Sequence, residues 1–264
     1  MKVSRVLVLA ASLSGLAVCT PAWAQSATAT APPLPPITEE DRRAAFPELR
    51  GHATHDRAFN AFVLFDQLEW QSPSSARRLS WDTKGWFGTD TNRFWFRSEG
   101  ERESGSGIGE AHAFYGRAVA RWWDLVAGIR QDVGGGPART WAALGIQGLS
   151  PYWFDVEATA YVGAGGRTHV RFEAEYDLLV TNRLILQPLF ETEIYGRSDP
   201  ERHVGAGLST IEGGLRLRFE IRRELGPYLG VVWNQKFLGT ADMARSRGDH
   251  TGQTKVIVGL RTWF

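Results

Sequence analysis

The sequence predicts an all-β protein, a transmembrane antiparallel β-barrel of about twelve strands with a flexible N-terminal arm. Segments of roughly ten residues with alternating polarity follow one another from Phe59 to the last residue. Tight and loose connections alternate between these segments. The 264 residues also include 11 Trp, 14 Phe and 29 Gly, which the aromatic girdles and glycine-rich turns of a membrane barrel would explain.

The final segment, residues 255–264, shows the alternation most clearly. One row of alternate side chains is apolar: Phe264, Thr262, Leu260, Val258 and Val256. The other row is mixed and includes Arg261. Because side chains on a strand alternate between two faces, this segment predicts a strand with one apolar face. A chain ending on such a strand is typical of the closing strand of an outer-membrane barrel, which would pair with the first strand near 59–70. A soluble sheet could end in the same way.

Twelve segments carry the strand pattern, and an even number suits a single-chain bacterial barrel. We predict strands over 59–70, 78–87, 92–100, 108–119, 122–133, 139–149, 153–163, 167–178, 183–195, 208–223, 227–237 and 254–264. Connections after the even-numbered strands are tight, whereas most others are longer, such as 196–207 and 238–252. Short turns are periplasmic and long loops external in such barrels, so both barrel ends should be periplasmic. No segment of this region shows convincing helical periodicity.

The direction in which the charged rows face can be decided by energy. In the tenth predicted strand, Leu215 and Leu217 alternate with Arg216, Arg218 and Arg222. A basic residue facing lipid near the midplane costs about 2–4 kcal/mol. Several such residues would exceed a typical folding stability of about 5–15 kcal/mol. The charged rows must therefore face a lumen. A soluble sheet would need a second layer to cover its apolar face, and no helices are evident.

The N-terminus has the pattern of an export signal. Lys2 and Arg5 precede an apolar run over 6–18, and an A-x-A site ends at Ala24. Cleavage there would remove Cys19, the only cysteine, although that cysteine also permits a lipoprotein interpretation. We therefore predict three parts: a signal peptide at 1–24, a Pro/Ala-rich periplasmic arm at 25–58 and the barrel at 59–264.

Several motifs, in their order and spacing, resemble one protein family. They are Asp41-Arg42-Arg43-Ala44-Ala45-Phe46-Pro47, Gly85-Trp86-Phe87-Gly88-Thr89-Asp90, Gly128-Ile129-Arg130-Gln131-Asp132, Glu173-Ala174-Glu175-Tyr176-Asp177 and Gly214-Leu215-Arg216-Leu217-Arg218-Phe219-Glu220-Ile221. The chain closely resembles the copper resistance protein B family of outer-membrane proteins. The resemblance implies a non-enzymatic barrel in the cell outer membrane that binds or transports copper. Its expected partners are outer-membrane lipid and copper, with a periplasmic copper protein or multicopper oxidase as a candidate.

One departure from the family bears on the copper chemistry. Members often carry a Met- and His-rich arm, but Met243 is the only methionine here beyond the first residue. Cu(I) favours sulfur ligands, whereas imidazole and carboxylate suit Cu(II). A copper site in this chain should therefore combine His with Asp or Glu, or borrow ligands from a partner. The formal net charge of +1 does not indicate the excess of basic side chains that nucleic-acid binding requires.

Two groups of residues are candidate metal ligands. His52, His55 and Asp56 could capture copper before the barrel begins, or could simply be a solvated polar linker. In the lumen, residues two apart on a strand share a face and could line a cation path. These lumenal candidates are Glu110 and His112 on one strand and His169, Glu173 and Glu175 on another, where Arg171 shares the same face.

The lumenal charges also permit a purely structural interpretation. Inside a narrow, constricted barrel, arginines could neutralise glutamates: Arg130, Arg216, Arg218 and Arg222 against Glu157, Glu173, Glu191, Glu193 and Glu220. The alternative function is then a structural or general outer-membrane barrel without metal selectivity. Catalysis is not expected, because the pair Asp249-His250 has no second acidic pair, and no serine is placed for nucleophilic attack.

Overall fold

The computed structural model describes residues 36–45, 58–72, 78–103 and 106–264. The chain divides into two units, Met1–His52 and Ala53–Phe264. In the first unit, helix α1 (Glu39–Ala45) begins after Thr38. The Thr38 hydroxyl accepts a hydrogen bond from the Asp41 amide at 3.2 Å, and the Asp41 carboxylate accepts one from the Thr38 amide at 2.9 Å. This reciprocal pair is a capping box with Asp in place of Glu.

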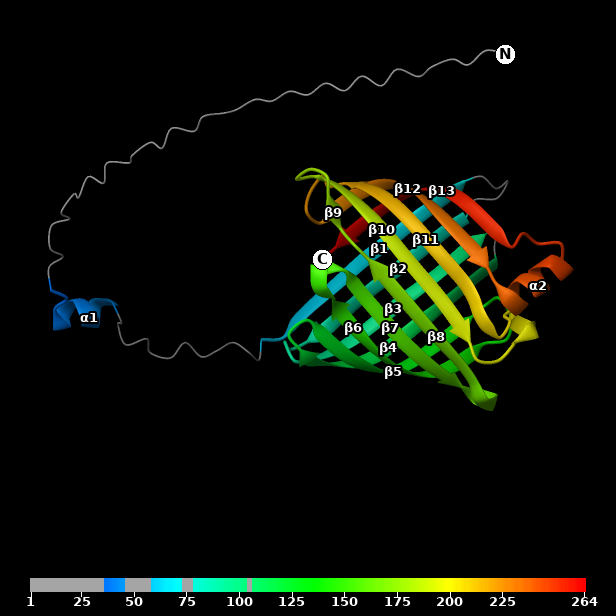
Figure 1. Cartoon of the computed structure of the whole chain (residues 1–264), viewed down its shortest axis with the longest axis horizontal. Helices are drawn as coiled ribbons and strands as arrows, with labels where there is room; N and C mark the ends of the chain where they lie inside the picture. Colours follow the sequence, from blue (N-terminus) through cyan, green and yellow to red (C-terminus); the bar gives the residue numbers. More distant parts are fainter. Residues whose placement is uncertain (1–35, 46–57, 73–77, 104–105) are drawn as a thin grey trace, which may run out of the picture. The chain divides into compact units, whose positions relative to one another are not determined.

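The second unit is an antiparallel sheet that closes on itself as a barrel (Figure 1). Its strands are β1 (Asn60–Ser72), β2 (Arg78–Gly88), β3 (Asn92–Glu103), β4 (Ser106–Ala120), β5 (Trp123–Val133), β6 (Arg139–Leu149), β7 (Asp155–Gly163), β8 (Arg167–Glu175), β9 (Leu178–Leu179), β10 (Leu184–Tyr195), β11 (Gly207–Phe219), β12 (Leu225–Lys236) and β13 (Gly252–Trp263). Neighbours in sequence pair around the ring, and pairing of β1 with β13 closes it. The predicted antiparallel barrel is confirmed.

These thirteen strands occupy twelve positions in the described ring, because β9 continues β8 along the same edge of β10. Glu175 pairs with Leu189, and Leu178 pairs with Leu186. A step of three residues forward on β8–β9 thus matches a step of three residues back on β10, so the register is unbroken. The interruption lies opposite Pro188, which has no backbone N–H to donate to a neighbouring strand. The predicted strand count of about twelve is therefore confirmed.

The barrel is apolar outside and charged inside. On the outer face, Leu144 and Val162 are 58% and 57% exposed. On the inner face, Arg216 and Arg218 are only 2% and 3% exposed. The predicted alternation and the lumenal position of the arginines are confirmed. A barrel with an apolar outer face and a charged inner face is suited to apolar surroundings outside and a polar lumen inside.

Two ends of the barrel can be told apart by their connections. The end that we call the turn end has the connections 89–91, 121–122, 150–154, 180–183 and 220–224, together with both ends of the barrel sequence. The opposite end, the loop end, includes the longer connections 196–206 and 237–251. Among the described residues, no helix is long and apolar enough to cross a membrane.

A helix at the loop end corrects one expectation. The connection after β12 was predicted to lack helical structure, but it contains α2 (Leu238–Ser246). Its buried residues are Thr240, Ala241 and Ala244, which share one helical face. The Thr240 hydroxyl accepts a hydrogen bond from the Gly205 amide at 2.9 Å. The helix is therefore held by tertiary contacts with the 196–206 loop, which sequence periodicity does not reveal.

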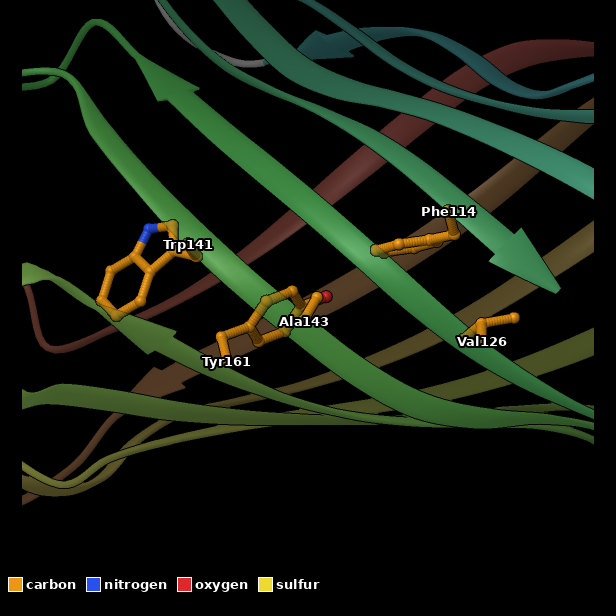
Figure 2. Close-up of a cluster of buried hydrophobic side chains, with 5 residues drawn as sticks. All are labelled: Phe114, Val126, Trp141, Ala143 and Tyr161. Carbon is orange, nitrogen blue, oxygen red and sulfur yellow. The ribbon is translucent and has the colours of Figure 1, made fainter.

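A small apolar cluster covers part of the inner wall. Figure 2 shows its members, which come from β4, β5, β6 and β7: Phe114, Val126, Trp141, Ala143 and Tyr161. Phe114 and Tyr161 are almost fully buried. Both rings contact His112 edge-on, with centroid distances of 5.2 Å and 5.9 Å. The cluster therefore fixes the position of one of the predicted metal-site residues.

Candidate functional site

Two large cavities lie in the lumen, with a narrow region between them. The loop-end cavity has a volume of about 500 Å³ and the turn-end cavity about 510 Å³. The narrow region, which we call the constriction, encloses only about 20 Å³, room for about one water molecule. It is lined by Asp82, Lys84, Arg97, Glu99, Glu110, His112, Glu157, Thr159, Arg171 and Glu173. The predicted constricted lumen is what the structure shows.

Arg171 lies at the centre of the ion pairs in the constriction. Its closest carboxylates lie on three other strands: Glu99 on β3 at 2.9 Å, Glu110 on β4 at 2.6 Å and Glu191 on β10 at 2.6 Å. Strand β10 is a neighbour of β8, but β3 and β4 belong to the opposite part of the ring. The Arg171 side chain therefore crosses the lumen and joins its two sides.

A second set of ion pairs crosses the lumen beside Arg171. Glu157 on β7 accepts from Lys84 on β2 at 3.5 Å and forms a close ion pair with Arg97 on β3. Each of these side chains is at most 14% exposed. Since the paired strands are far apart in the ring, these contacts fill the lumen rather than tie neighbouring strands together.

Glu110 and His112 meet as the sequence predicts. Their side chains share the inner face of β4, and His112 Nε2 lies 2.8 Å from Glu110 Oε1. Glu110 also pairs with Arg130 at 2.5 Å, so its carboxylate is fully engaged. His112 is 5% exposed, and its Nδ1 has no hydrogen-bond partner. A neutral ring that donates from Nε2 to Glu110 keeps a free lone pair on Nδ1, the arrangement common among metal-binding histidines.

His169 lies apart from the constriction. Its ring is stacked between Tyr161 and Tyr195, with centroid distances of 5.0 Å and 4.2 Å. Its Nε2 lies 3.4 Å from Glu193 Oε1, and its Nδ1 lies 3.4 Å from Arg130. The side chain is 1% exposed. Packing on both ring faces makes His169 part of the wall rather than an open ligand.

Glu173 and Glu175 differ in their surroundings. Glu175 is buried beside the turn-end cavity and accepts a hydrogen bond from Gln187 at 2.9 Å. Glu173 lines the constriction and is directly opposite Glu157 on one side and Glu191 on the other. Like charges directly opposite on adjacent strands are destabilising. The structure therefore concentrates negative charge around Glu173.

The predicted residues do not assemble into a ready metal centre. Over the ranges that the structure describes, no three His, Cys, Asp or Glu side chains are grouped so that they could hold a metal ion. Glu110 and His112 are adjacent, whereas His169 and Glu175 have other partners. His52, His55 and Asp56 lie outside the described residues. Their role as copper ligands remains a prediction.

Sequence reasoning missed four charged residues of the constriction: Asp82, Lys84, Arg97 and Glu99. The signal was present, because Asp82 and Lys84 are two apart on β2, and Arg97 and Glu99 are two apart on β3. With them included, the constriction has five carboxylates against three cationic side chains. A lining with more carboxylates than cationic side chains is the kind that favours cations over anions.

The closed ring, with its apolar outer face and charged interior, defines an antiparallel β-barrel of the kind that crosses a membrane with strands. A solved structure described as the NanC porin is similar, with a TM-score of 0.51 and 10% sequence identity over 77% of this chain and 99% of that one. This likeness concerns the fold alone.

Sequence comparison then gives the family. Residues 59–264 match the family described as copper resistance protein B precursor (CopB). Copper resistance protein B from Escherichia coli is 51% identical over 233 residues, which cover 88% of this chain and 79% of the relative. The copper resistance protein B homolog of Pseudomonas syringae pv. tomato is 46% identical over 97% of this chain and 89% of its own length. The chain belongs to the copper resistance protein B family.

Proposed function

We propose that this protein is a non-enzymatic outer-membrane barrel that contributes to copper resistance by binding copper or moving it through the lumen. Membership of the copper resistance family supports a role in copper tolerance. The apolar outer face supports a membrane location with surrounding lipid. The single observation in favour of a cation cargo is the constriction, whose carboxylates outnumber its cationic groups.

The chemistry of the lumen suits a transient contact with copper better than tight storage. His112 offers one free imidazole nitrogen, and Glu173 lies close by in the same constriction. Imidazole and carboxylate are suitable ligands for Cu(II). Conduction requires binding that is weak enough for the ion to leave. We therefore propose passage or brief binding of Cu(II) here, with His52, His55 and Asp56 as a capture group before the barrel.

A general barrel without metal selectivity is the second candidate. It is favoured by the ion pairs that already engage Glu110, Glu157 and Glu191. In that case the charges would only fill the lumen and hold its walls together. A periplasmic copper protein or multicopper oxidase is a proposed partner under the first candidate and is not required under the second.

Flux into liposomes that contain the purified protein separates these two candidates. Entry of Cu(II) should exceed entry of Zn(II), and a neutral sugar should be excluded. Equal entry of all three, or no entry together with no copper binding, would refute the copper-selective function.

The capture group has its own test. Replacing His52 and His55 together with Ala should lower copper binding by the purified protein, because two imidazoles are lost. Replacing the exposed His250 with Ala is the matched control and should leave binding unchanged. Unchanged binding in the double variant would remove both histidines from the copper site.

A further inference from the structure

We propose that Arg171 is a tethered cation that closes the constriction, and that a permeating divalent cation must displace it from its carboxylates. The proposal rests on the proposed function only in taking the cargo to be a cation. It concerns how the lumen is gated and which charge it admits.

The position of Arg171 suits a gate better than a wall support. From β8, its guanidinium reaches Glu99 and Glu110 on the far side of the ring while it holds Glu191 on the adjacent strand. A guanidinium is planar and presents several donors in a fixed fork, so one side chain can satisfy several carboxylates at once. Since the enclosed volume is only about 20 Å³, room for about one water molecule, an ion with its hydration shell does not fit while Arg171 stays there.

The surroundings of Arg171 favour entry of a second cation. Asp82 and Glu173 line the same constriction, and neither has an ion pair or side-chain hydrogen bond within the described part of the chain. His112 also lines it, is 5% exposed, and has an unpartnered Nδ1. The constriction thus holds two free carboxylates and a free imidazole nitrogen beside the carboxylates that Arg171 occupies.

Charge decides the competition between Arg171 and an incoming ion. At equal distance from a carboxylate, a divalent ion has twice the Coulomb attraction of a guanidinium. The guanidinium is tethered to β8, so it can swing aside toward Glu191 and return when the ion leaves. Without Arg171, the remaining cationic residues of the constriction are Lys84 and Arg97, against all five carboxylates. The vacated path should therefore admit cations and repel anions.

Single-channel recording in planar bilayers tests the gate with potassium chloride alone. The wild-type barrel should conduct little. Arg171→Gln should raise the conductance severalfold, and under a salt gradient the reversal potential should move toward that of potassium. Arg93→Gln is the matched control, because Arg93 pairs with Asp124 at 2.9 Å beside the turn-end cavity, outside the constriction. It should conduct as the wild type does. An unchanged or anion-selective Arg171→Gln channel would overturn the gate.

A conservative variant covers the case in which Arg171→Gln does not fold. Arg171→Lys keeps the charge, but an ammonium cannot hold carboxylates in the fixed geometry of a guanidinium. We expect it to fold, as judged by heat-modifiable gel migration, and to conduct more than the wild type. If Arg171→Lys is folded and as closed as the wild type, the gate is refuted.

Copper flux separates failure of the gate from failure of the proposed function. If Arg171→Gln raises potassium conductance but neither protein admits copper, the gate stands and the copper function fails. If wild type and Arg171→Gln admit copper equally, with the same potassium conductance, the copper function stands and the gate fails.

Discussion

At the scale of single residues, Asp199 shows how the long loop after β10 is held. Its carboxylate accepts from Arg139 Nε at 3.1 Å and lies 3.2 Å from Arg167 Nε. Burial raises the pKa of Asp199, but the hydrogen bond from Arg139 and the charges of Arg139 and Arg167 outweigh it and hold the pKa below its usual 3.8. Asp199 also makes a backbone bridge with Val204. One carboxylate thus ties the loop to two strands.

Replacing Asp199 with Asn should loosen the 196–206 loop by about 1.5–3 kcal/mol, the range for a hydrogen bond to a charged group. Because the folded-state pKa is depressed, the stabilisation is present above pH 3.8 and is lost as the pH falls below it. Hydrogen exchange of the loop amides at several pH values measures both effects. The control Asp249→Asn removes a half-exposed pair with Arg247 and should change little. Equal protection in wild type and Asp199→Asn would contradict this account.

The side-chain contacts of the constriction show which parts of the site can be predicted from the sequence. The contact between Glu110 and His112 was predictable, because two residues on one strand decide it. The partners of Arg171 across the lumen were not, because Glu99 and Glu110 lie on strands that meet it only after the ring closes. Their distances depend on strand tilt and register around the whole barrel, which no local pattern contains.

At the scale of elements, strand alternation was the most predictable feature. Period two needs only the sequence of one strand, so the faces of β8 and β11 followed directly from it. The two deviations came from elsewhere. Pro188 on β10 interrupts the neighbouring β8, and contacts with the 196–206 loop hold α2. In both cases a different segment determines the local structure.

The outer face of β6 offers a test of the membrane assignment. Thr140 and Leu144 share this face, Thr140 near the loop end and Leu144 near the middle. Leu144→Arg should destabilise the folded barrel in lipid vesicles by about 2–4 kcal/mol, whereas Thr140→Arg should cost about 0–1 kcal/mol. Urea unfolding of the vesicle-embedded protein measures both. Equal costs at the two positions would mean that no lipid core surrounds this face.

At the scale of the whole molecule, closure depends on the seam between β1 and β13. The Val63 and Phe264 main chains exchange two hydrogen bonds, of 2.9 Å and 3.1 Å. Further along the seam, Val258 pairs with Trp70 of β1 and with Leu229 of β12. The sequence predicted this pairing because a barrel leaves no free edge, so its first and last strands must meet.

A proline at Val258 should prevent closure of the ring. Proline removes the backbone N–H in the middle of the sheet, and each unsatisfied backbone group in a lipid-surrounded wall costs on the order of several kcal/mol. Unheated Val258→Pro should therefore migrate on a denaturing gel like the heated, unfolded chain, whereas the wild type should migrate as a compact species. Val258→Ala, which shortens the side chain but keeps the N–H, is the control and should stay compact. A compact Val258→Pro band would show that the barrel holds together without a continuous seam.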